Sequence, residues 1–160
     1  MRWVRFSVLV IFITIIQAGV FAKFDVKPDI LLILLVFFSV YSNTREAIIT
    51  SFVIGFCADL IGNVMGPGIL SYTIFGTILA YMHRVIAIRK IHHQVISIFL
   101  TGLFAGIFTA LLALLKSQDF NVELIKTIFW ISICSSIVGP FLFPPFTWWM
   151  RIKPDRYSRR

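Results

Sequence analysis

The chain has 160 residues, of which 59% are hydrophobic and only 14% are charged. A soluble domain carries about 25% charged residues, so this composition excludes an ordinary soluble domain and predicts an all-α polytopic membrane protein. The net charge of +8 is concentrated at the ends of apolar runs, which predicts membrane orientation rather than nucleic-acid binding.

Six apolar runs follow one another, and each predicts a transmembrane helix of a single domain over residues 1–150. The expected spans are about 6–22, 29–42, 46–61, 69–88, 95–115 and 124–146. A span needs about 20 residues, so the second and third runs are short. They form either a tight pair of spans or a re-entrant hairpin, which is tolerated at membrane depth when protein surrounds it.

The first run also has features of a signal peptide. Basic residues precede it, and Val20-Phe-Ala22 resembles a cleavage site. Its apolar stretch of about 16 residues is at or above the usual limit for such a segment. Removing it would leave an odd number of spans, so we expect the run to be retained as the first transmembrane helix.

Lys and Arg residues indicate how the spans are oriented. In a six-span arrangement most of them fall on the side of the N-terminus, in segments that contain Arg2, Arg45, Lys90 and the basic tail at residues 151–160. Because segments rich in Lys and Arg stay in the cytoplasm, we expect both termini and the tail to be cytoplasmic.

Asp29 opens the second run, directly after Pro28. Proline suits the first turn of a helix, and an aspartate at a helix N-terminus accepts hydrogen bonds from free backbone N–H groups. Capping of this helix explains the pair, and contact with another helix or with a partner protein is the alternative.

Asp59 lies inside the third run, four residues after Gly55 on the same helical face. Hydrocarbon does not solvate a charge, so a buried acid must pair, reach water or hold a proton. Three interpretations remain open: an acid at the membrane interface, a buried acid bonded to backbone amides or to the hydroxyls of Ser71 or Tyr72, and part of a proton relay. Gly55 permits the close approach of another helix.

Gly66, Pro67 and Gly68 follow the third run and predict a compact turn on the non-cytoplasmic side. Glycine adopts positive φ angles freely, and proline fixes φ. A phosphate-binding loop would need a lysine that this segment lacks.

Small residues mark faces of the last two runs. Gly102 and Gly106 form a GxxxG motif, which favours close helix contact, either inside the chain or with a partner. The sixth run has a comparable face, made of Ser132, Ser135, Ser136 and Gly139.

No arrangement typical of catalysis occurs in the sequence, such as a nucleophile elbow, a zincin motif or a Ser/His/Asp set. Cys57 and Cys134 lie inside apolar runs without the spacing of a zinc site or a disulfide framework. We therefore expect no enzymatic activity, no cofactor and no bound metal.

Three segments together resemble the MreD family of bacterial rod shape-determining membrane proteins. They are Pro28-Asp29 with the apolar helix start that follows, Gly55-Phe-Cys-Ala-Asp59, and Gly66-Pro-Gly68 leading into an apolar helix with Gly76. The specific part of the resemblance covers residues 28–76, and the second half agrees in hydropathy alone.

The resemblance implies a non-enzymatic scaffold of the cell-wall elongation complex in the inner membrane, needed for rod shape and lateral peptidoglycan synthesis. It implies a fold similar to the substrate-binding S components of energy-coupling-factor transporters. It also implies an MreC-like single-span partner, together with an MreB-like actin, a RodA-like glycosyltransferase and a class B penicillin-binding protein. The GxxxG face and the small face of the sixth run are candidate contacts for the MreC-like span.

A substrate-binding subunit of a vitamin transporter is the alternative function, since six spans and a small size suit it equally well. It requires an enclosed polar pocket for a ligand. Few polar residues are available to line one, and the candidates are Asp59, Asn63, Tyr72 and Tyr81.

Overall fold

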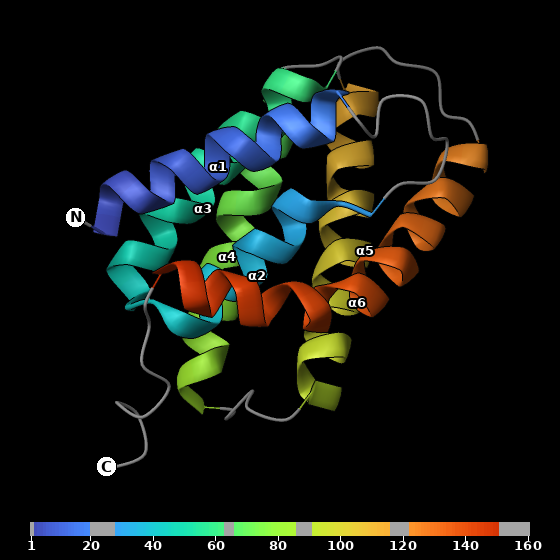
Figure 1. Cartoon of the computed structure of the whole chain (residues 1–160). Coiled ribbons are helices and arrows are strands. Elements are labelled where there is room, and N and C mark those ends of the chain that lie inside the picture. The colour runs from blue at the N-terminus through green and yellow to red at the C-terminus, as the bar shows by residue number, and fades with distance from the viewer. Residues whose placement is uncertain (1, 20–27, 63–65, 86–90, 116–121, 151–160) are drawn as a thin grey trace.

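The computed structural model describes residues 2–19, 28–62, 66–85, 91–115 and 122–150, and these residues form a bundle of helices (Figure 1). The helices are α1 (Arg2–Gly19), α2 (Ile30–Tyr41), α3 (Thr44–Ile61), α4 (Pro67–Val85), α5 (Ile91–Leu115) and α6 (Val122–Met150). Each coincides with one predicted run. The largest differences are an earlier start for α1 and α5 and a later end for α6.

The short helix α2 is the centre of the bundle. All ten residues from Leu31 to Val40 are buried, and α2 contacts each of the other five helices. A helix of 12 residues is only about 18 Å long, which is well short of the roughly 30 Å of bilayer hydrocarbon. Because protein surrounds α2 on every side, its backbone and its ends are covered by other helices rather than by lipid.

Helix α6 changes direction along its length. Its first part runs beside α5, and its last part, red in Figure 1, crosses beneath α2. Pro140, Pro144 and Pro145 lie within the second half of this helix. A proline inside a helix removes a backbone hydrogen bond and bends the axis. The bend places Phe143 and Phe146 against Phe37 of α2, with ring centroids 5.6 Å away in each case.

Successive helices run in opposite directions. The starts of α1, α3 and α5 lie at the same end of the bundle as the last residues of α2, α4 and α6 (Figure 1). Trp149 near the end of α6 donates a hydrogen bond to the Arg5 carbonyl of α1, 3.4 Å away. The start of α1 and the end of α6 therefore lie side by side.

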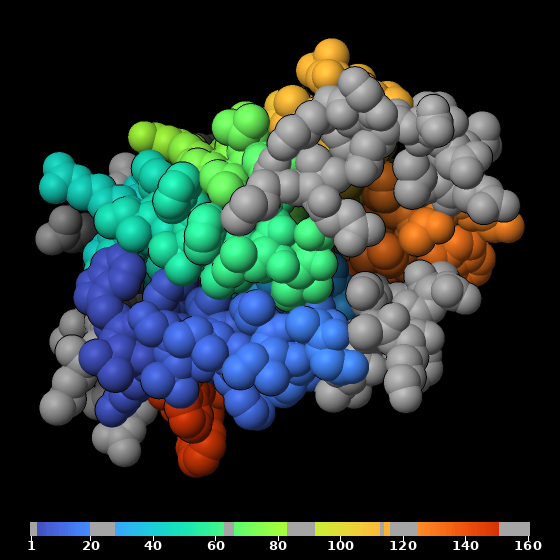
Figure 2. All heavy atoms as spheres, turned by 90° about the horizontal axis from the view of Figure 1, so that it is seen from above, coloured from blue at the N-terminus to red at the C-terminus, as the bar shows by residue number. Residues whose placement is uncertain are grey.

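Large apolar side chains cover the outside of the bundle. Exposed Ile, Leu and Phe residues recur at helical spacing, for example Val4, Val8, Ile11 and Ile15 on α1, which lies along one flank against α3 (Figure 2). Soluble proteins rarely expose such continuous apolar surface. Two stretches, His92–Leu112 and Ile125–Met150, are long and apolar enough to cross a membrane, and α1, α2 and α4 contain shorter apolar stretches.

Candidate functional site

Four helices meet at Asp29. Its Oδ1 accepts hydrogen bonds from the Leu32 backbone N–H at 3.1 Å and from Gln17 Nε2 of α1 at 3.0 Å. The Tyr72 hydroxyl of α4 donates to Oδ2, and the Asp29 N–H donates to Ser135 Oγ of α6 at 2.8 Å. Asp29 thus caps α2 and also ties it to α1, α4 and α6.

Both interpretations of the Pro28-Asp29 pair therefore apply together, since Asp29 caps its own helix and contacts others. The position of Pro28 differs from expectation. It precedes the capping residue and lies outside the first turn of α2, which begins at Ile30. The side-chain oxygen of Gln17 also accepts a hydrogen bond from the Leu31 N–H at 3.1 Å. Gln17 thus satisfies a second free N–H of α2.

A cavity of about 330 Å³ lies beside this cluster, between α2, α4, α5 and α6. Its polar wall consists of Asp29, Tyr72, Thr109, Ser132 and Ser135. The rest of its lining is small or apolar and includes Leu32, Gly102, Gly106, Ala110, Ile128 and Ile131. Of the four residues proposed for a ligand pocket, only Tyr72 lines this cavity. Asp59 is bonded elsewhere, Tyr81 is exposed, and Asn63 lies outside the described residues.

Asp59 binds the start of α4 from the neighbouring helix α3. Its Oδ2 accepts from the Gly66 N–H at 2.8 Å and the Ile69 N–H at 3.0 Å, and its Oδ1 accepts from the Gly68 N–H at 2.7 Å. Asp59 is 5% exposed. The first N–H groups of a helix have no partner within the helix and favour negative charge. The structure thus supports the interpretation of a buried acid bonded to backbone amides, and Tyr72 bonds Asp29 instead.

Glycines allow α3 and α4 to come this close. A Cβ atom on Gly55 would lie 2.9 Å from Ile69 Cα and 3.0 Å from the Gly68 oxygen. A Cβ on Gly68 would collide with the Asp59 carboxylate. Gly66 has a φ of 117°, a conformation that glycine adopts without strain, and Pro67 begins the helix. The predicted turn is therefore correct at Gly66, whereas Gly68 belongs to the first turn of α4.

The GxxxG face of α5 packs inside the chain. A Cβ on Gly102 would lie 3.1 Å from Ser132 Oγ, and one on Gly106 would lie 2.5 Å from Ile128 Cγ2. Ser135, Ser136 and Gly139 of α6 are buried as well. The two faces suggested for an MreC-like span thus face each other, the core or the cavity beside Asp29.

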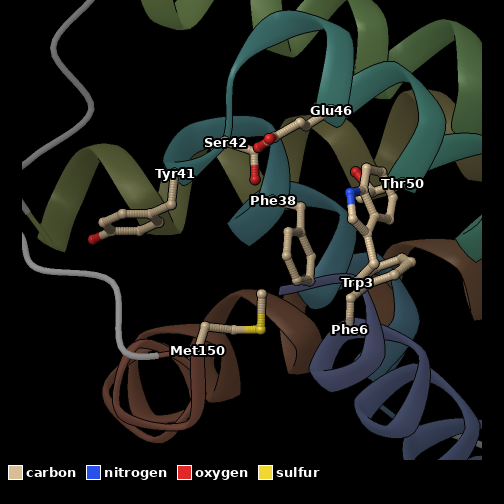
Figure 3. A pocket seen from close by; sticks show the side chains of 8 residues that line it. All are labelled: Trp3, Phe6, Phe38, Tyr41, Ser42, Glu46, Thr50 and Met150. Carbon is tan, nitrogen blue, oxygen red and sulfur yellow. The ribbon is translucent and has the colours of Figure 1, made fainter. Parts of the chain in front are cut away.

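A smaller hollow of about 60 Å³ lies at the opposite end of α2 (Figure 3). Trp3, Phe6 and Phe38 form one wall, Met150 closes it from α6, and Glu46 and Thr50 line it from α3. The hollow is too small for a cofactor. It shows that the starts of α1 and α3 and the end of α6 come together.

The described residues contain no group of three or more His, Cys, Asp and Glu side chains that would hold a metal ion. Asp29 and Asp59 each have their own hydrogen-bond partners, so the structure does not combine them into one site. Sequence reasoning missed Gln17 as a partner of Asp29. Its signal was present, since Gln17 is an amide within an otherwise apolar run.

An all-helical bundle with a buried central helix and an apolar outer surface defines a helical membrane protein. The chain matches the family model described as rod shape-determining protein MreD over residues 1–153. This match covers nearly the whole chain, and the chain belongs to the MreD family. Comparisons with curated proteins and with solved structures gave no significant match.

Proposed function

We propose that this chain is a non-enzymatic, multi-pass scaffold of the cell-wall elongation complex in the bacterial inner membrane. The observation that carries this proposal is the family match over residues 1–153, which ties the chain to rod shape determination. The geometry supports a scaffold because Asp29 and Asp59 are both bonded to backbone N–H groups at helix starts. Carboxylates held in this way organise helix contacts rather than carry out acid–base chemistry.

The proposed partner is an MreC-like single-span protein, with an MreB-like actin, a RodA-like glycosyltransferase and a class B penicillin-binding protein as further members. Since the small faces of α5 and α6 are packed internally, the partner's span binds outward-facing side chains. Candidates are the exposed face of α3, with Phe52 and Phe56, and that of α5, with Leu100 and Phe104. In a bilayer such contacts form by close packing, because lipid competes equally for apolar surface.

Co-purification tests the partner. The tagged chain, solubilised in mild detergent, is expected to retain an MreC-like protein, while a tagged multi-pass protein of the same membrane does not. Phe52→Trp and Phe104→Trp, made singly, identify the face, because a bulkier side chain at the contact lowers recovery of the partner. Failure to enrich an MreC-like protein from membranes that contain one would contradict the proposed contact.

We also propose six passes with both termini cytoplasmic, an arrangement that the alternating helix directions support. Cysteine labelling tests it in a variant that lacks the two native cysteines. A membrane-impermeant maleimide should label Gly62→Cys in intact cells and Asn43→Cys only after lysis. If α2 and α3 formed a re-entrant hairpin, the residue at 43 would stay unlabelled on both sides.

The alternative, a substrate-binding subunit of a small-molecule transporter, gains support from the 330 Å³ cavity. Such a subunit would form a complex with an energy-coupling membrane protein and an ATPase. Their recovery with the tagged chain, in place of cell-wall proteins, would favour this alternative.

A further inference from the structure

The cavity beside Asp29 presents a carboxylate in its wall. Its volume of about 330 Å³ falls at the lower end of the range typical of small-molecule sites. None of the described residues that line it is Lys, Arg or His. Asp29 is half-buried, so its carboxylate is not sealed from the cavity. Three hydrogen bonds, from Gln17, Leu32 and Tyr72, already stabilise this carboxylate. An ammonium group would add the attraction of an opposite charge in low-dielectric surroundings.

The two ends of the cavity differ in chemistry. Hydroxyls of Tyr72, Thr109 and Ser135 surround Asp29 at one side, and Leu32, Ile128 and Ile131 supply apolar walls. The Tyr72 hydroxyl donates its proton to Asp29, so its oxygen presents lone pairs. The Thr109 hydroxyl is already engaged, since it donates to Ser71 Oγ at 2.7 Å. The polar side therefore offers mainly acceptors and negative charge.

We propose that this cavity binds a small organic cation, a primary ammonium group attached to a short apolar or aromatic body. The ammonium group would donate to the Asp29 carboxylate and the Tyr72 oxygen, and the body would lie against the walls from α5 and α6. A carboxylate or phosphate ligand is disfavoured, because Asp29 would repel it. This binding goes beyond the scaffold role and does not depend on it.

Phenethylammonium is a suitable probe. 2-Phenylethanol and 3-phenylpropionate carry a neutral and a negative group on the same two-carbon linker. A ligand that binds the folded state alone raises the melting temperature with its concentration. For the purified full chain in detergent, we expect phenethylammonium to raise the melting temperature most, the alcohol less and the acid not at all. Isothermal titration calorimetry then gives the affinity of the cation.

Three variants locate the binding. Ala110→Leu fills the cavity from α5 without touching the polar cluster, and it should weaken the affinity at least about tenfold. Asp29→Asn keeps a good helix cap but removes the charge, and it should have a similar effect. Leu111→Phe, one residue along on the exposed face, serves as the control and should leave the affinity unchanged.

The proposal is overturned if the three probes shift the melting temperature equally, since that indicates partition into detergent. It is also overturned if no probe binds, or if Ala110→Leu binds phenethylammonium as tightly as the unchanged chain. Should Asp29→Asn fail to fold, Ala110→Leu and the matched acid still decide the outcome. Normal rod shape in cells that carry Ala110→Leu would show that the scaffold role does not require this binding.

Discussion

At the residue scale, the buried Asp59 and the half-buried Asp29 show how a helical membrane protein can use charge for structure. Asp59 accepts hydrogen bonds from three N–H groups at the start of α4. Asp29 accepts one from a backbone N–H of its own helix and one each from the side chains of a tyrosine and a glutamine. Both lie where helix dipoles favour negative charge. The cost of placing an acid among apolar helices is thereby offset by hydrogen bonds rather than by ion pairs with described residues.

Asp59→Ala tests this structural role. The substitution leaves three N–H groups of a buried helix start without their acceptor, and each such group costs about 1–3 kcal/mol. We expect a loss of about 3 kcal/mol or more, measured as a lower melting temperature in detergent. Asp59→Asn retains one acceptor oxygen and should lose less. An alanine variant as stable as the asparagine variant would show that these hydrogen bonds do not hold α4.

Gly55→Ala tests the close approach of α3 and α4. The added Cβ would lie 2.9 Å from a backbone atom of Ile69, so the two helices must separate. Overpacking of this kind costs about 1–3 kcal/mol. Gly19→Ala is the matched control, because no atom of the described residues lies within 4 Å of its Cβ position, and it should be neutral or slightly stabilising. Equal melting temperatures for the two variants would contradict the account.

Local signals in the sequence were sufficient for several of these residues. The capping role of Asp29 and the close contact at Gly55 follow from residue type and short spacing. The partners of Asp29 do not follow, since Gln17, Tyr72 and Ser135 lie 12, 43 and 106 positions away along the chain. Nothing in a single sequence relates residues at such separations.

At the element scale, α2 and α6 depend on each other. The second run was expected to be a short span or half of a hairpin, and its length and apolar character predicted the helix correctly. What the sequence did not indicate is that α2 would be surrounded by the other five helices. The prolines of α6 predicted a bend without its direction, which is decided by packing of Phe143 and Phe146 on Phe37.

Phe37→Ala tests this contact. Phe37 is 0% exposed and its loss would leave a cavity at the junction of α2 and α6, which costs about 3–5 kcal/mol in a well-packed core. We expect a marked fall in the melting temperature. Phe141→Ala changes the same residue type on α6 where the ring is 77% exposed, and it should have little effect. Similar effects of both substitutions would mean that the bend of α6 is not held by this packing.

The GxxxG motif shows a further limit of sequence reasoning at this scale. Its spacing predicted close contact correctly, and the contact is with α6 of the same chain. Spacing alone does not identify the partner helix, because small residues favour contact with any helix that presents a complementary surface. The outward faces of α3 and α5, which we propose as contacts for a partner, carry no such motif.

At the scale of the whole molecule, composition and the six apolar runs predicted a polytopic helical bundle, and the family match ties it to rod shape determination. The 330 Å³ cavity was not predicted, because it arises where four separate helices fail to fill the space between them.

Depletion of this chain in the organism that encodes it tests the central claim most directly. We expect rod-shaped cells to become wide and rounded as the protein is lost, measured as the ratio of cell length to width by microscopy. Expression of the unchanged chain from a second locus should restore the ratio. Cells that remain normal rods through many divisions without detectable protein would contradict a role in cell-wall elongation.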